Sequence, residues 1–197
     1  YGVLETSGVN YPALTDIGTL APSLRDDIYQ NLRLFTLWPV GRRFAGDFAV
    51  KRSELASALV LSGRVPQYLP GHANYTDVRD AGTMLFVESA QASPTGALFT
   101  DVTTGGQFRP LDSVTRMTAA VAFVRAAGLR SQAEAMAGST LTYTDTLSIP
   151  SELRGYAALA VAKGFLQADT AFRPQGLFTR ADLARATAAI QRRAIQP

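Results

Sequence analysis

Three stretches of this sequence repeat at a fixed interval, and this repetition limits the folds that are open to the chain. Each stretch has a Phe eight residues before an Arg, and small and apolar residues follow the Arg in the same register. The 64 residues from Arg52 to Arg116 are matched by the 64 from Arg116 to Arg180. A looser anchor opens each copy with Leu or Tyr followed by Thr and Asp, at Asp16, Asp77 and Asp145. This self-similarity predicts a triplicated unit.

Each unit is expected to contain two helices joined by a loop, and the second helix is the clearer one. Thr115 and Thr179 stand where an N-cap belongs, and Asp182 completes a capping-box pattern with Thr179. Lys51 replaces the Thr in the first unit, so that helix is expected to lack a side-chain cap. Apolar residues then recur on one stripe of an amphipathic helix. The repeated Arg is therefore the first helical residue in each unit.

The first helix of each unit is less regular. In the first unit it follows Pro22 and carries Leu24, Ile28, Leu32 and Phe35 on one face. In the third unit it begins at residues 150–152. In the middle unit residues 79–92 read as a helix that Ser93-Pro94 ends early, so we expect a shorter helix there. Residues 97–107 are then expected to form an extended loop.

A helix-loop-helix unit of this size cannot bury its apolar faces alone, so the three units are expected to pack together. We predict an all-α fold in which the three second helices meet at a pseudo-threefold axis and the first helices lie outside, bridging neighbouring units. The boundaries divide the chain into a linker (1–12), repeat 1 (13–74), a divergent repeat 2 (75–142) and repeat 3 (143–197), which form one cooperative module. Segments 64–74 and 129–142 are expected to be the crossings between units.

The composition excludes several function classes. The chain has no Cys and one His, His72, which excludes disulfides, thiol chemistry and Cys-ligated zinc and disfavours any metal site. Because no catalytic or phosphate-loop motif occurs, we expect no catalytic residue and no cofactor, although a glycosidase with two carboxylates stays open. A net charge of +3, with cations dispersed through three units, argues against nucleic acid. No apolar stretch is long enough to predict membrane insertion.

The repeated arginine requires an explanation, because a cation at a helix N-terminus opposes the helix dipole. A guanidinium and the free amides of a first turn together form a strong receptor for an anion. The alternative is structural: each Arg pairs with an acidic residue of a neighbouring unit, such as Asp16, Asp77 or Asp145. The two interpretations are compatible, since a carboxylate can hold a guanidinium in place for a ligand.

Other repeated residues allow two interpretations each. Phe44, Phe108 and Phe172 are expected to be core residues. Arg109 and Arg173 flank the turn before the second helix, where they widen a positive rim or belong to a solvated surface. Trp38, the single Trp, is expected to pack in the core or at its edge, the alternative being a stacking face for a sugar.

The pattern resembles the S-layer homology domain, whose helix start is Thr-Arg-Ala-Glu. The matching tetrapeptides begin at Lys51, Thr115 and Thr179, and the resemblance covers roughly residues 13–194. It implies a three-pronged helical module, with the motif helices in a central bundle, that anchors exported proteins to the cell wall. The implied ligand is a secondary cell-wall polysaccharide, often pyruvylated, or peptidoglycan, with the motif Arg as the anion contact in grooves between units. The candidate ligand-binding residues are Arg52, Arg116, Arg180, Asp16, Asp77, Asp145, Arg173, Arg109 and Trp38.

The departures from the family motif leave a second interpretation. The first motif lacks the Thr and the second lacks the acidic residue. The net charges of the three predicted repeats are +2, −1 and +3, so the best groove is expected at Arg180 or Arg52 and the weakest at Arg116. A degenerate module could instead serve as a protein-protein interaction or oligomerisation domain of a larger secreted hydrolase, for example a subtilisin-like protease. Both interpretations place the protein outside the cell, at the cell surface.

Overall fold

A computed structural model describes residues 14–195, so the linker expected at 1–12 lies outside the described residues. Within this range the regular elements are helices, with isolated bridges but no β-strand, and the predicted all-α class is confirmed. The α-helices are α2 (Pro22–Arg33), α3 (Arg52–Leu61), α4 (Ala81–Gln91), α5 (Arg116–Ala126), α6 (Arg130–Ala135), α7 (Arg154–Ala162) and α8 (Arg180–Ile195). Two short 3₁₀ turns, Thr146–Ser148 and Ser151–Leu153, precede α7.

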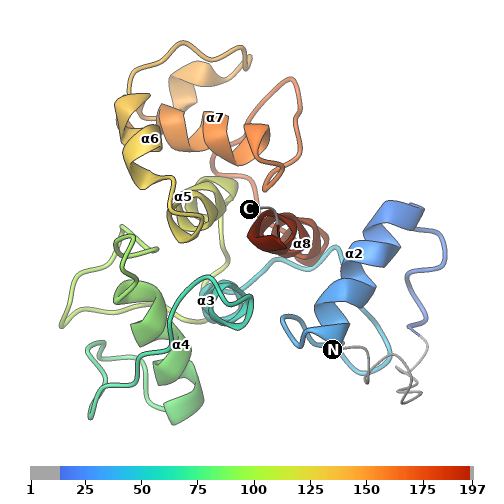
Figure 1. Cartoon of the computed structure of the whole chain (residues 1–197), viewed down its shortest axis with the longest axis vertical. Coiled ribbons are helices and arrows are strands. Elements are labelled where there is room, and N and C mark those ends of the chain that lie inside the picture. The colour runs from blue at the N-terminus through green and yellow to red at the C-terminus, as the bar shows by residue number, and fades with distance from the viewer. Residues whose placement is uncertain (1–13, 196–197) are drawn as a thin grey trace.

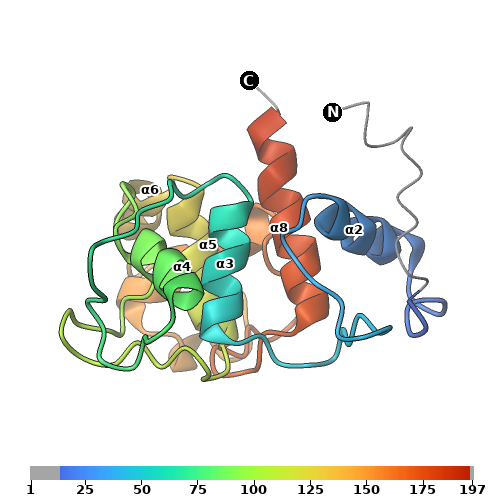
Figure 2. The ribbon, with the colours of Figure 1, turned by 90° about the horizontal axis from the view of Figure 1, so that it is seen from below.

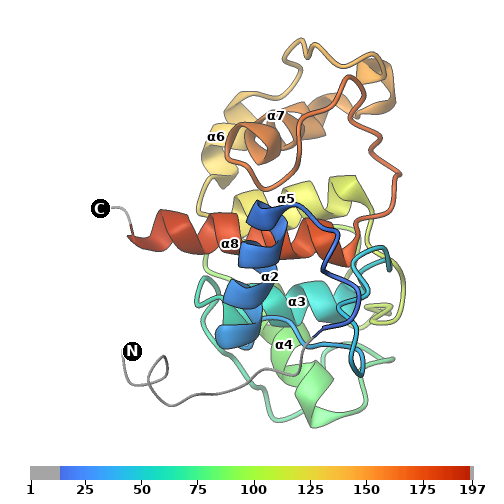
Figure 3. The same ribbon diagram turned by 90° about the vertical axis from the view of Figure 1, so that its right-hand side faces the viewer.

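The helices form a central group and an outer group. In Figure 1, α3, α5 and α8 lie at the centre, seen nearly end-on, and α2, α4 and α7 lie around them. The outer helix α4 packs on α3, α7 packs on α5, and α2 packs on α8. Figure 2 shows the central helices side by side, with α8 projecting beyond the others, and Figure 3 shows α2 crossing α8. The outer helices α4 and α7 therefore pack on the central helix that precedes them in the chain, whereas α2 packs on α8, at the other end of the chain.

The central helices begin where the sequence predicts. Arg52, Arg116 and Arg180 are their first residues. The Thr115 hydroxyl accepts a hydrogen bond from the Thr118 amide, and Thr179 and Asp182 exchange bonds as a capping box does. Lys51 gives α3 no side-chain cap, as expected from its chemistry. The division into three repeats stays a prediction.

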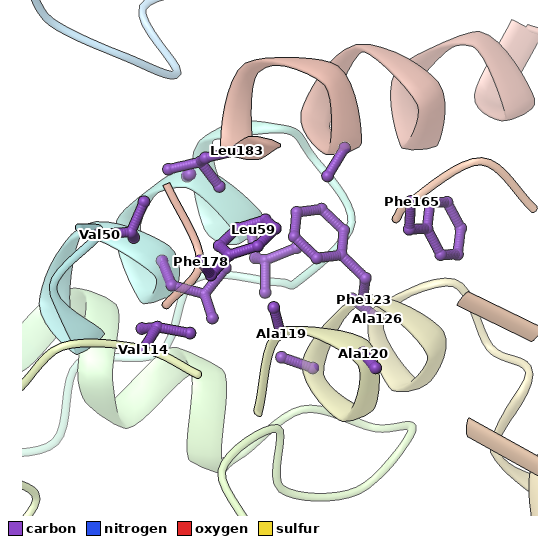
Figure 4. Close-up of a cluster of buried hydrophobic side chains, with 14 of the residues drawn as sticks. Val50, Leu59, Val114, Ala119, Ala120, Phe123, Ala126, Phe165, Phe178 and Leu183 are labelled. Atoms are coloured by element: carbon purple, nitrogen blue, oxygen red, sulfur yellow. The ribbon is translucent and has the colours of Figure 1, made fainter. Parts of the chain in front are cut away.

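The core lies where the three central helices converge. Figure 4 shows Phe123 of α5 among Leu59 of α3 and Phe178, the residue just before the Thr179 cap of α8. The Phe123 ring lies 5.7 Å from that of Phe165 and 6.2 Å from that of Phe178, measured between centroids. All four side chains are fully buried. The repeated Phe44, Phe108 and Phe172 are buried as predicted.

The structure corrects the prediction in two places. The middle unit does not have a shortened outer helix, because α4 has 11 residues, against 12 in α2 and 9 in α7. The crossing expected at 129–142 contains α6, a six-residue helix too short to show a periodic pattern. It packs against α7, where Gly155 allows close approach: a Cβ there would lie 1.9 Å from the Ala133 carbonyl oxygen.

Candidate functional site

The N-terminal ends of the three central helices are joined by a closed ring of backbone hydrogen bonds. The Val50 amide donates to the Phe178 carbonyl at 2.9 Å, the Phe178 amide to the Val114 carbonyl at 2.9 Å, and the Val114 amide to the Val50 carbonyl at 2.8 Å. All three side chains are buried. This ring fixes the relative positions of the three helix starts, and with them the positions of the first-turn arginines.

Each of these arginines reaches the loop before a different central helix. The Nε atoms donate to phenylalanine carbonyls at 2.8–3.0 Å, in the pairs Arg52 to Phe108, Arg116 to Phe172 and Arg180 to Phe44. In each pair the guanidinium also lies over the ring of the same phenylalanine, 4.9–5.6 Å from its centroid. The geometry is a cyclic exchange, in which every central helix contacts the loop that precedes another one.

The three anchor aspartates bind the backbone amides of these loops and do not pair with the motif arginines. Asp16 accepts the amides of Phe44 and Ala45, and Asp77 and Asp145 accept the equivalent pairs of amides at Phe108–Arg109 and Phe172–Arg173. The second residue of each pair has a positive φ, from 54° to 61°. A carboxylate that binds two adjacent amides can hold such a left-handed residue in place.

The pKa values of two of these aspartates agree with their role as acceptors for the loop amides. Desolvation acts to raise the pKa of Asp16 and of Asp145, but the hydrogen bonds from the backbone amides outweigh it, so both pKa values lie below the usual range. The charges of Arg43 and Arg173 lower them further. Both carboxyl groups are therefore ionised at neutral pH, with their oxygens already occupied by the loop.

Two of the three motif arginines are buried in ion pairs. Arg52 is 4% exposed and donates both terminal nitrogens to the two Asp101 oxygens, each at 3.0 Å. Arg180 is 6% exposed and pairs with Glu54. Desolvation acts to raise the pKa of Asp101, but the bonds and charge of Arg52 outweigh it and the pKa is lowered. These two guanidinium groups are neutralised by the chain itself.

Arg116 differs from the other two. Its side chain is partly exposed, and its Nη2 donates only to the Gln167 carbonyl at 3.3 Å. Among the described residues no carboxylate forms an ion pair with it. Its charge helps to lower the pKa of nearby Asp169, whose largest stabilising contact is the Thr170 amide and whose carboxylate pairs with Arg173 at 2.7 Å. Arg116 is thus the motif cation that is least compensated.

Two surface hollows open beside the starts of the central helices. One, of about 270 Å³, lies against α5 and is lined by residues that include Asp101, Thr118 and Leu153. The other, of about 450 Å³, lies against α8 and is lined by residues that include Asp16 and Arg185. Both are lined by apolar residues and by the Thr that precedes the helix, but the charge differs: the first has only the carboxylate of Asp101, whereas the second has Arg43 and Arg185 beside its carboxylates and is the one suited to a polar ring with an acidic substituent.

Comparison with known families agrees with this geometry over part of the chain. Residues 142–184, which include Asp145, α7 and the start of α8, match the model of the S-layer homology domain. Over these residues the chain is similar to the S-layer homology domain. No curated protein matches the chain. S-layer homology domains are binding modules without catalytic activity that associate with the cell surface and bind cell-wall polymers.

No helix described is long and apolar enough to cross a membrane. In the same residues no three His, Asp or Glu side chains are grouped as metal ligands would be.

The predicted site residues do not form one cluster. The exposed Arg109 pairs with Asp101, and the exposed Arg173 pairs with Asp169. Trp38 is not in the core as expected: its residue is 59% exposed, and its ring lies 5.3 Å from that of Phe35. It is nevertheless next to a motif arginine, because its carbonyl accepts Nη2 of Arg180 at 2.5 Å.

Sequence reasoning missed the carboxylates that neutralise the buried arginines. Glu54 occupies the acidic position of the S-layer homology motif and was available as a candidate, but its partner, Arg180, is 126 residues away. Asp101 lies in the remodelled loop of the middle unit, where no repeat marks it. The pair of Arg52 and Asp101 could be identified only from the way the loops pack in the structure.

Proposed function

We propose that this chain anchors an exported bacterial protein to the cell wall by binding an acidic wall glycan beside Arg116. The ligand class is a secondary wall polysaccharide that carries carboxylate groups, such as ketal-linked pyruvate, or peptidoglycan. The observation that carries the proposal is the contrast among the three motif arginines. Arg52 and Arg180 are buried against chain carboxylates, whereas Arg116 is partly exposed and has only carbonyl partners.

The surroundings of Arg116 support an acidic ligand. Its Nε is held by the Phe172 carbonyl and its plane by the Phe172 ring, so the guanidinium is fixed in direction before a ligand arrives. Arg173 adds a second cation nearby and forms the ion pair with Asp169, whose pKa the charge of Arg116 also lowers. With a carboxylate of the ligand, Arg116 would form charge-assisted hydrogen bonds, which are stronger than those it donates to the two peptide carbonyls. The charge of each repeat predicted the weakest binding groove at Arg116, so placing the ligand there reverses the expected order of the three grooves.

Co-sedimentation with bacterial wall sacculi tests this proposal. Sacculi are used before and after acid extraction of the secondary polysaccharide, and the wild-type chain is compared with Arg116→Gln. The matched control is Arg79→Gln, which removes the same charge from an exposed residue before α4. We expect Arg116→Gln to weaken pelleting at least about tenfold, as loss of a charge-assisted contact does, with little change in Tm. Arg79→Gln is expected to bind like wild type.

The outcomes separate the possible polymers. Binding that acid extraction removes points to the secondary polysaccharide, and binding that survives extraction points to peptidoglycan. Added salt should weaken either interaction, because the contact is between charges at a partly exposed site. A folded wild-type chain that pellets with neither preparation would contradict wall anchoring.

A protein-interaction module is the second candidate, and the ion pairs of Arg52 and Arg180 favour it. If those arginines exist to join parts of the fold, the module could retain the architecture while its grooves bind a protein or another copy of the chain. Under this alternative Arg116→Gln would leave wall pelleting unchanged, and equilibrium sedimentation of the chain would show association.

A further inference from the structure

An exposed pair of aromatic rings stands at the end of α2. Trp38 is 59% exposed and Phe35 is 49% exposed, and their centroids are 5.3 Å apart with the ring planes tilted by 43°. Leu34 and Val40, in the same segment, are also exposed. Most of the large apolar side chains in this protein are buried, so a group of four in seven consecutive residues needs a reason.

Phe35 occupies a backbone position that three of the other helices give to glycine. It is the first residue after the C-cap of α2, with φ of 54°. At the same position α3, α5 and α7 have Gly63, Gly128 and Gly164, with φ between 73° and 75°. A bulky side chain in this left-handed conformation costs roughly 1–2 kcal/mol. Phe35 therefore has a strained backbone although its side chain is half exposed and gains little from burial. Such strain is typical of residues with a functional role.

The aromatic pair is held rigidly from both sides. Thr36, which lies between Phe35 and Trp38 in the sequence, is buried, and its hydroxyl donates to the Asn31 side-chain oxygen at 2.6 Å. Asn31 is itself fully buried and donates to the Ala184 carbonyl of α8. On the other side the Trp38 carbonyl accepts Nη2 of Arg180. A preorganised surface of this kind loses little entropy when a ligand binds.

The occupant is a sugar ring rather than a protein. Four exposed apolar side chains are few beside the 20–30 residues per side, roughly, of a stable protein interface. A pyranose ring presents one apolar face the size of an aromatic side chain, with a polar rim. The charged residues of segment 34–43 are Arg42 and Arg43, both exposed. Arg43 is paired with Asp16 at 3.6 Å, so Arg42 supplies the charge that complements an acidic glycan. Gln167, whose carbonyl binds Arg116 as the Trp38 carbonyl binds Arg180, offers no such ring.

We propose that Phe35 and Trp38 form a stacking subsite for a pyranose ring of the wall glycan, separate from the anion contact at Arg116. This inference rests on the proposed function and extends it, because a polymer with repeated sugars can occupy both places at once. Two weak contacts on one polymer reinforce each other through effective concentration. The subsite recognises the sugar itself, and Arg116 recognises its acidic group.

The single Trp of the chain makes the test direct. The full chain is titrated with acid-extracted wall polysaccharide and, separately, with disaccharide muropeptides released from the same walls by lysozyme. We expect a shift or quench of Trp38 emission with one of these probes. Trp38→Ala and Phe35→Gly should weaken pelleting by sacculi about tenfold each, as loss of one ring contact does, while Trp38→Phe retains most of the affinity. Tm should be unchanged in Trp38→Ala and unchanged or higher in Phe35→Gly, where the strain is relieved.

Three results would contradict the stacking subsite and leave the proposed anion contact at Arg116 unaffected. These are an unchanged Trp38 emission at a polysaccharide concentration that saturates pelleting, wild-type affinity in Trp38→Ala, or a fall in Tm that accounts for the lost binding. The salt dependence separates the two proposals: the aromatic variants should keep the wild-type slope, whereas Arg116→Gln should reduce it. If wild type binds neither probe nor sacculi, the proposed function fails and the subsite fails with it.

Discussion

Arg180, the first residue of α8, forms a buried ion pair with Glu54 in the first turn of α3, although 126 residues separate them. The same guanidinium donates to the carbonyls of Phe44 and Trp38. One side chain therefore ties the last helix to the first central helix and to the loop between α2 and α3. Its charge is used inside the molecule, which is why the anion site is proposed at Arg116 instead.

Replacing Arg180 should test this structural role. We expect Arg180→Ala to lower the free energy of unfolding by about 2–3 kcal/mol, because Glu54 and two carbonyls lose their partner in a largely buried place. Arg116→Ala should cost about 1 kcal/mol or less, since its contacts are neutral and partly hydrated. Urea unfolding of both variants checks the contrast. Equal losses would mean that the two arginines are equally structural, and the basis for placing the ligand at Arg116 would be gone.

Three aspartates with lowered pKa values predict how stability depends on pH. The pKa values of Asp16, Asp101 and Asp145 lie below the ordinary 3.8 in the folded chain. Carboxyl groups with lowered pKa values contribute stability that is fully present above the unfolded pKa and is lost as the pH falls through the folded values. The free energy of unfolding should therefore be nearly constant with respect to these groups from about pH 6 to about pH 5 and fall steadily below about pH 4.

Asp145→Asn provides the control for this pH dependence. The amides of Phe172 and Arg173 each donate to a different oxygen of Asp145, and Asn replaces one of these oxygens with an NH2 group that cannot accept. The variant should be less stable at neutral pH and lose less stability on acidification than wild type, as measured by urea midpoints across the range. A pH slope identical to that of wild type would show that this carboxylate does not contribute.

What the sequence predicted well was local. The starts of α5 and α8 follow from Thr115, Thr179 and Asp182, because an N-cap depends only on residues within one turn. The recurrence of Asp16 identified an important residue, but not its partners. Those are backbone amides about 28 residues away, next to a left-handed residue that no propensity favours.

What the sequence did not predict depended on contacts between loops. Arg52 and Arg180 share one motif position, yet their carboxylates, Asp101 and Glu54, come from unrelated places in the repeat pattern. Phe35 fitted the apolar face of α2 by its spacing. It lies outside because the helix ends at Arg33, two residues before it, and the reversal of φ turns its side chain toward solvent.

The contact between α6 and α7 predicts a severe effect at one glycine. Gly155→Ala would place a methyl group 1.9 Å from the Ala133 carbonyl oxygen, so the two helices must separate. We expect a loss of about 3 kcal/mol in thermal or urea unfolding, as overpacking against backbone produces. The matched control is Gly164→Ala, where a Cβ meets nothing within 4 Å and only the positive φ of 75° is unfavourable. That variant should lose about 1 kcal/mol.

The uncapped start of α3 predicts a stabilising substitution. Lys51 has the extended backbone of an N-cap, with φ of −84° and ψ of 154°, close to Thr115 with −86° and 160°, but its side chain accepts no hydrogen bond. In Lys51→Thr the hydroxyl can accept the amide of Glu54, as Thr115 accepts that of Thr118. We expect a gain of about 1 kcal/mol, or roughly 2–4 °C in Tm. Lys51→Ala removes the unfavourable cation without adding a cap and should gain only about 0.3 kcal/mol, so equal stability of the two variants would show that the hydroxyl does not cap the helix.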